Sequence, residues 1–211
     1  MNNKSYYILI SILFFIGCKQ TSDSYFDQAR KKHDQNDLKG AIEDYSSAIE
    51  LDSTIATYFY NRGVAHLELN ETVPAIQNFS KSIQLDSLSY SSFYNRGIAE
   101  FILNKYDNAI QDFSKTVELY NIAEIENDST KLKAYFNRAV AKEKINDFVG
   151  AISDYSKVIL LSDTVADAYY NRGILNYYKM NNREAGCSDL KNAEILGSQI
   201  AKSAFRDLCN K

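Results

Sequence analysis

Charged side chains that recur at regular spacing are the first candidates for chemistry in this sequence. Four arginines that each follow an asparagine recur at regular spacing, and a series of aspartates occurs with a similar spacing. A guanidinium can bind an anion, but it also pairs bidentately with a carboxylate. Because the two series share a spacing, we expect structural ion pairs between adjacent helices rather than an anion site. The residues are Arg62, Arg96, Arg138 and Arg172, and Asp44, Asp112, Asp154 and Asp189.

Catalytic and metal-binding arrangements have little support in the sequence. His33 and His66 are the two histidines, and no HExxH motif, phosphate-cradling glycine loop or zinc-type spacing is present. The carboxylates are distributed as they are on solvated helix faces. We therefore expect no enzymatic activity, no cofactor and no metal.

The overall composition is that of one folded domain. The chain has 211 residues, of which 45% are hydrophobic, and its 24 basic against 27 acidic residues give a net charge of -3. Such a chain can bury a core and is not biased towards disorder. Nucleic-acid binders usually carry a basic patch, so no nucleic-acid partner is expected.

The N-terminus has the pattern of an export signal. An apolar run from Tyr6 to Ile16, broken only by Ser11, precedes Gly17 and Cys18. Eleven helical residues rise about 16 Å, which is too short to cross roughly 30 Å of hydrocarbon. The pattern predicts a signal peptide over residues 1–17.

The four residues 15–18 resemble a bacterial lipobox, in which the cysteine is lipidated and becomes the mature N-terminus. This resemblance implies an acylated Cys18, a tether over residues 18–24 and attachment to a membrane. The alternatives are an ordinary signal peptide with an incidental cysteine, or an uncleaved anchor. The absence of Asp after Cys18 resembles the outer-membrane sorting pattern, so we expect the periplasmic side of the outer membrane.

Two motifs repeat through the rest of the chain. Asn-Arg-Gly begins at residues 61, 95 and 171, and Asn-Arg-Ala begins at 137. Ala-Ile, followed two residues later by Asp or Asn and an aromatic residue, begins at 41, 75, 109 and 151. Since 75 minus 41 and 109 minus 75 are both 34, whereas 151 minus 109 is 42, the period is 34 with one insertion of eight.

The period and these motifs resemble the tetratricopeptide repeat over residues 25–196. The resemblance implies an all-α superhelix of about five helix-turn-helix repeats, at approximately 25–55, 56–89, 90–131, 132–165 and 166–196. Gly197 then precedes an amphipathic segment that we expect to form a capping helix over residues 197–211. The insertion, at 120–131, is expected to interrupt the stack between the third and fourth pairs; it is either functional or merely tolerated.

A small residue returns at one position of every first helix. Glycine inside a helix costs roughly 1 kcal/mol relative to alanine, so its recurrence implies a packing reason. We expect the second helix to cross closely there and to fill the space below with an aromatic side chain. The aromatic and small residues of the first helices are Phe59 and Gly63, Phe93 and Gly97, Tyr135 and Ala139, and Tyr169 and Gly173.

First helices line the concave surface of tetratricopeptide domains, which makes their polar and aromatic residues the candidate groove. Asparagine can accept and donate to the backbone of an extended peptide, and aromatic side chains supply contact area. This pattern resembles the asparagine ladder of peptide-holding relatives; alternatively, the residues belong to the generic repeat and face solvent or neighbouring helices. The pairs are Tyr60-Asn61, Tyr94-Asn95, Phe136-Asn137 and Tyr170-Asn171.

Two cysteines lie near the C-terminus. Cys187 is ten residues before Gly197 and Cys209 is twelve after it, so an antiparallel turn at Gly197 would bring them to the same height. We expect a disulfide that clamps the cap, worth about 3 kcal/mol in the entropic model. The alternative is two buried free thiols.

The sequence as a whole predicts a membrane-anchored scaffold or adaptor of the bacterial cell envelope that binds a protein or an extended peptide. Two other functions are compatible with it. One is a structural assembly element that docks through its ends, and the other is a periplasmic module that binds a glycan or metabolite.

Overall fold

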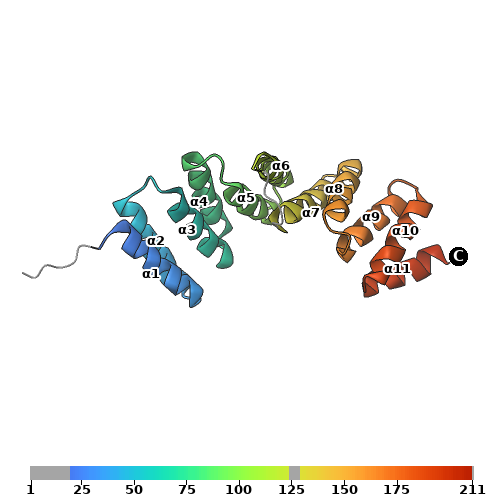
Figure 1. Ribbon diagram of the computed structural model, residues 1–211, viewed down its shortest axis with the longest axis horizontal. Helices are drawn as coiled ribbons and strands as arrows, with labels where there is room; N and C mark the ends of the chain where they lie inside the picture. Colours follow the sequence, from blue (N-terminus) through green and yellow to red (C-terminus); the bar gives the residue numbers. More distant parts are fainter. Residues whose placement is uncertain (1–19, 124–128, 211) are drawn as a thin grey trace, which may run out of the picture.

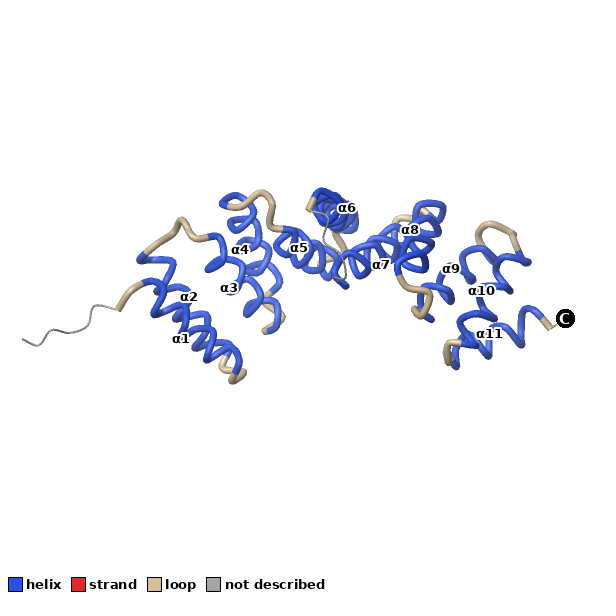
Figure 2. Tube along the Cα trace, in the orientation of Figure 1, coloured by secondary structure: helices blue, strands red, loops and turns tan. Residues whose placement is uncertain are grey.

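The computed structural model describes residues 20–123 and 129–210, and this part of the chain contains eleven helices and no strand (Figure 2). The predicted signal peptide and Cys18 lie outside the described residues. None of the described helices is both long and apolar enough to cross a membrane. The helices are α1 (Ser22–Asp34), α2 (Leu38–Leu51), α3 (Ala56–Glu68), α4 (Thr72–Leu85), α5 (Tyr90–Ile102), α6 (Tyr106–Ile122), α7 (Ser129–Lys144), α8 (Phe148–Leu161), α9 (Ala166–Tyr178), α10 (Arg183–Ile195) and α11 (Gln199–Cys209).

The first ten helices form five antiparallel pairs that stack in chain order, and α11 packs on α10 as a single terminal helix. Figure 1 shows the pairs following one another from α1 and α2 at one end to α11 at the other. Each pair contacts chiefly the pairs before and after it, as in other solenoids. The predicted fold class, an all-α superhelix of five helix pairs with a terminal helix, is confirmed.

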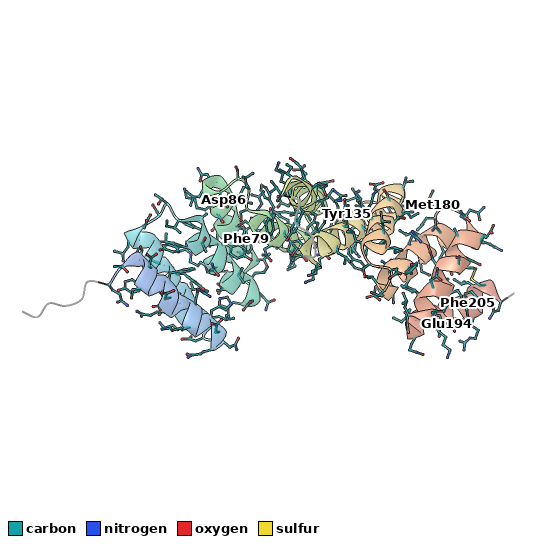
Figure 3. All side chains as sticks on the ribbon, in the orientation of Figure 1. Phe79, Asp86, Tyr135, Met180, Glu194 and Phe205 are labelled. Carbon is teal, nitrogen blue, oxygen red and sulfur yellow. A yellow bond between two sulfur atoms is a disulfide. The ribbon has the colours of Figure 1, made fainter. Side chains whose placement is uncertain are left out.

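In the second and third pairs, the crossing of the first and second helices brings a glycine against an aromatic ring. A Cβ atom added to Gly63 would lie 2.8 Å from Cε1 of Phe79, which Figure 3 labels, and one added to Gly97 would lie 2.8 Å from Cε1 of Phe113. Both distances are far below van der Waals contact, so glycine allows the ring to lie under the first helix. The second helices contribute fully buried alanines, which are Ala41, Ala75, Ala109 and Ala151.

Left-handed asparagines close the turn inside every pair. Asn70, for example, has φ of 60°, and the next N–H, that of Glu71, donates to the carbonyl of His66 at 2.8 Å. This is the hydrogen-bond pattern of a Schellman cap, in which asparagine often replaces glycine. The residues that share the conformation are Asn36, Asn70, Asn104, Asn146 and Asn181.

Two segments differ from the sequence prediction. The predicted tether would reach Ser24, but Ser22–Ser24 already form the first turn of α1, capped by Thr21, whose Oγ1 accepts from the N–H of Ser24 at 3.2 Å. The insertion does not interrupt the stack, because α6 continues to Ile122 and packs against α7. Tyr120 anchors this extension: it is 1% exposed, and its ring centroid lies 4.4 Å from that of Tyr90.

The terminal helix is fixed to the last pair by a covalent bond and by side-chain contacts. The structure contains a disulfide between Cys187 of α10 and Cys209 of α11, whose Cα atoms are 5.7 Å apart. The Nζ atom of Lys191 lies 5.0 Å from the ring centroid of Phe205, and Tyr177 donates to the carbonyl of Leu208 at 3.3 Å. Figure 3 labels Phe205 on α11. The exposed end of the last repeat is thereby covered.

Replacing Asn70 tests the left-handed turns. Asparagine tolerates a φ of 60° better than alanine because its short polar side chain can hydrogen-bond locally, so Asn70→Ala should lower the free energy of unfolding by about 1 kcal/mol. Glycine adopts this conformation without a Cβ penalty but loses more chain entropy on folding, so Asn70→Gly should change the free energy of unfolding by less than about 0.5 kcal/mol. Urea unfolding followed by circular dichroism measures both; equal losses in the two variants would contradict the role given to the conformation.

Candidate functional site

The recurrent arginines each bridge three consecutive helices. Arg96 of α5 donates from Nε and Nη2 to Asp112 of α6 at 2.8 and 2.7 Å, and from Nη1 to Ser80 of α4 at 3.1 Å. Two later arginines repeat this geometry, Arg138 with Asp154 and Ser114, and Arg172 with Asp189 and Ser156. These guanidinium groups join one repeat to the next and are not free to bind a ligand.

The first members of both series depart from the predicted ion pairs. Arg62 has no carboxylate partner in the described part of the chain; its Nε donates to Asn78 at 2.8 Å and its Nη1 to Ser46 at 2.9 Å. Asp44 pairs instead with Lys32, at 2.7 Å. The reason is positional: the partner of each arginine lies on the second helix of its own pair, where the second repeat has asparagine.

The electrostatics of the arginines follow from these partners. Hydrogen bonding to Asp112 raises the pKa of Arg96 above its ordinary value, and Asp189 does the same for Arg172. Burial lowers the pKa of Arg62, because no carboxylate opposes the cost of removing its charge from water. The charged form of Arg62 in the second repeat is therefore less stabilised than the charged forms of Arg96 in the third and Arg172 in the fifth.

The aromatic members of the predicted groove pairs mainly pack on the second helices. The ring centroid of Tyr60 lies 6.1 Å from that of Phe79, that of Tyr94 lies 5.9 Å from that of Phe113, and Phe136 lies 5.5 Å from Tyr155. Tyr170 is half-buried at the equivalent position of α9. Burial raises the pKa of both Tyr60 and Tyr94.

The four asparagines form a row, here called the asparagine row, consisting of Asn61, Asn95, Asn137 and Asn171. Asn95 donates from Nδ2 to the hydroxyl of Tyr60 at 3.2 Å and to the carbonyl of Ser91 at 3.0 Å, which uses both of its N–H groups. Asn137 likewise donates to Tyr94, and Asn171 donates to Tyr155. For Asn95, Oδ1 is then the polar atom left to bind a ligand, and it can only accept.

Crevices open between consecutive first helices. The crevice between α5 and α7, here called the α5/α7 crevice, has a volume of about 100 Å³ and is lined almost entirely by apolar side chains. One member of the asparagine row, Asn137, lies in its wall. Its residues are Ile98, Phe101, Ile102, Phe113, Asn137 and Val140.

An equivalent crevice near the N-terminus has different chemistry. The α1/α3 crevice has a volume of about 250 Å³ and is lined by charged and polar groups. The two crevices correspond position by position, so that Tyr45 stands where the other has Phe113 and Asn61 stands where it has Asn137. The lining residues are Arg30, His33, Asp34, Tyr45 and Asn61.

The sequence interpretation missed the serines that complete the arginine bridges. Ser46, Ser80, Ser114 and Ser156 directly follow the aromatic residues of the second helices, at the same intervals of 34, 34 and 42 residues as the Ala-Ile motif. This recurrence could have identified the four serines from the sequence. Within the two described ranges, no group of three or more His, Cys, Asp or Glu side chains is placed to hold a metal ion.

The stacked pairs, their small-residue contacts and their 34-residue period define a tetratricopeptide-type solenoid. In agreement, the family model described as TPR repeat matches residues 29–70. No match to the chain was found among curated proteins.

Solved structures with the same fold include YrrB, described as a TPR protein with an unusual peptide-binding site. It is 25% identical over 90% of this chain and 94% of its own, with a TM-score of 0.77. MamA is 22% identical over 87% and 95%, with a TM-score of 0.76. A MamA structure from Desulfovibrio magneticus RS-1 is 14% identical over 83% and 94%, with a TM-score of 0.72.

Exchanging Asn and Asp between two repeats tests the arginine bridges. Asn78→Asp gives Arg62 the carboxylate that the later repeats have, and it should raise the free energy of unfolding by about 1 kcal/mol, despite the loss of the bond from Asn78 Nδ2 to the Pro74 carbonyl. The reciprocal change, Asp112→Asn, should lower it by about 2 kcal/mol, because Arg96 loses its charged partner. Denaturant unfolding of both variants checks this, and destabilisation by Asn78→Asp would refute it.

Proposed function

We propose that this protein is a non-catalytic scaffold that binds an extended segment of another protein along its first helices. The observation that carries the proposal is the α5/α7 crevice, an apolar cavity placed beside Asn137 of the asparagine row. Such a combination offers one apolar anchor point and polar atoms that can fix the register of a bound chain.

The physical basis of the binding is an apolar side chain that enters the crevice between helices. Exposed Ile102, which is 53% accessible, forms its mouth, and Phe113, which is 1% exposed, forms its floor. Burying one aliphatic side chain there is worth about 1.5–3 kcal/mol. Since both N–H groups of Asn95 are already used, its Oδ1 is suited to accept a hydrogen bond from a backbone N–H group of the partner.

The similarity to YrrB supports the same assignment, because that protein is described as having a peptide-binding site and it shares this fold over most of its length. The proposal concerns the class of partner, which is a protein segment in extended conformation. It does not depend on which protein supplies that segment.

We further propose that the scaffold is held at a membrane of the bacterial cell envelope by acyl chains on Cys18, on the periplasmic side of the outer membrane. The supporting features are the short apolar run ending at Ile16, the small residue Gly17 before the cysteine, and the absence of Asp after it. Acyl chains bind membranes through burial of their methylene groups, and two or more chains are needed for a stable anchor.

Ile102→Gln tests the peptide-binding proposal. The substitution keeps the helix and places an amide at the mouth of the α5/α7 crevice, so an apolar side chain entering there loses contact area. Peptides selected from a random twelve-residue display library on the purified full-length protein should bind the variant about fivefold more weakly, as measured by fluorescence anisotropy.

Leu160→Gln is the matched control, because Leu160 is 78% exposed on α8 and does not line the crevice. It should leave peptide affinity unchanged. If the library yields no binder of the unmodified protein, or if the two variants weaken binding equally, the proposed function is wrong.

Cys18→Ser tests the anchor. Cells given an alkyne analogue of palmitate should label the unmodified protein, and the variant should lose the label and leave the membrane pellet. A variant in which Cys187 and Cys209 are both replaced by Ser should keep the label, because those residues form the disulfide. An unlabelled unmodified protein would rule out lipidation, and sedimentation with inner-membrane markers would rule out the outer membrane.

A further inference from the structure

We propose that the α1/α3 crevice is a recognition site for a carboxamide, the side chain of an Asn or Gln residue in the bound segment. This inference rests on the proposed function, because it specifies part of the chemistry of the same partner. It is carried by separate residues at the N-terminal end of the first-helix face, whereas the α5/α7 crevice lies near the middle of that face.

The first observation is a buried hydroxyl that has no partner. Tyr45 is fully buried, and its hydroxyl makes no hydrogen bond within the described chain. An unsatisfied buried polar group costs about 1–3 kcal/mol, so native structures seldom retain one without a reason. Burial raises the pKa of this phenol to about 12, which keeps it protonated and able to donate at neutral pH.

The same position in the other repeats shows that the hydroxyl is not required for packing. Phe79 and Phe113 fill it in the second and third repeats and are equally buried. Tyr155 fills it in the fourth, where its hydroxyl donates to Glu143 at 2.5 Å and accepts from Asn171 at 3.2 Å. Tyr45 therefore carries a polar group that a phenylalanine would omit and that no neighbour uses.

Asn61 provides a second incomplete group in the wall of this crevice. Asn95 and Asn137 each donate to a tyrosine hydroxyl on the preceding first helix, but the residue facing Asn61 in that register is Phe26, which has no hydroxyl. Among the described residues, the amide of Asn61 donates only to the carbonyl of Thr57, at 2.8 Å. One N–H and Oδ1 of Asn61 thus remain to meet a ligand.

Charged groups at the rim narrow the chemistry of the ligand. Arg30 and Asp34 are both exposed, both line the crevice, and neither forms an ion pair in the described part of the chain. A carboxylate entering the site would be attracted by Arg30 but repelled by Asp34, and the reverse holds for an ammonium group, so the pair of rim charges favours neither ion. A carboxamide is neutral, and it offers an acceptor to Arg30, Asn61 and Tyr45 and donors to Asp34.

The site is reached from the open side of the crevice. The hydroxyl of Tyr45 lies beneath the half-buried side chains of the wall, so the entering amide must turn one of them, such as His33, to reach it. His33 is held by a hydrogen bond between its Nε2 and Oε2 of Glu68, which lie 3.0 Å apart; this surface contact contributes little net stability. This rearrangement would give the buried hydroxyl of Tyr45 a hydrogen-bond partner and would break the exposed contact between His33 and Glu68.

The test compares Tyr45→Phe with the unmodified full-length protein in the same random peptide library. The unmodified protein should enrich Asn or Gln at one library position, and Tyr45→Phe should still select peptides but without that preference. Synthetic peptides that carry Gln, Glu or Leu at this position should bind the unmodified protein with about a fivefold advantage for Gln, which falls to about one on the variant.

Tyr155→Phe is the matched control, because it removes the equivalent hydroxyl outside the α1/α3 crevice and should leave the Gln preference unchanged. Tyr45→Phe should melt no lower than the unmodified protein, because it removes a buried hydroxyl that has no partner. Tighter binding of Glu than Gln, or a Gln preference that survives Tyr45→Phe, would overturn the inference while leaving the proposed function intact. A library without any binder would overturn both.

Discussion

The contact on which the structure depends is the approach of a first-helix backbone to an aromatic ring of the second helix. At Gly63 and Gly97 there is no room for a Cβ beside Phe79 and Phe113. No helix pair can bury its apolar face alone, so each ring is covered from both sides by its own pair and the next one. Phe113 is also the floor of the α5/α7 crevice, so the same residue sets the crossing of the helices and the character of the binding surface.

A polar layer lies next to this apolar contact and holds successive repeats in register. Each arginine bridge joins the two helices of one pair to the second helix of the pair before it, as Arg138 does with Asp154 and Ser114. Pairs of this kind have fixed geometry because guanidinium and carboxylate meet in two parallel bonds. Because these arginines are used in structure, recognition is left to the asparagine row and to the two crevices.

Much of the fold could be predicted from the sequence because residues that occupy equivalent packing positions recur at the spacing of the repeat. The 34-residue spacing, the small residues and the aromatic positions led to five helix pairs and a terminal helix. The exchange of partners at Arg62 and Asp44 was not predicted, since similar spacing alone does not show which second-helix residue an arginine meets. Comparing positions sixteen residues after each arginine would have found Asn78. The extension of α6 through Ile122 was also missed, because an insertion of eight can lengthen helices as readily as it can form a loop.

The candidate site was less predictable because its character depends on contacts between repeats. Asn95 is satisfied by Tyr60 of the preceding repeat, whereas Asn61 faces Phe26 and is not, although both stand in the same Asn-Arg-Gly motif. In a solenoid each repeat touches mainly its neighbours, so changing one floor or facing residue alters one crevice and leaves the rest of the stack unchanged. The polar α1/α3 crevice and the apolar α5/α7 crevice therefore lie in a fixed order and at a fixed distance from each other along the molecule. A partner that must satisfy both crevices at once is selected by the spacing of two side chains as well as by their types.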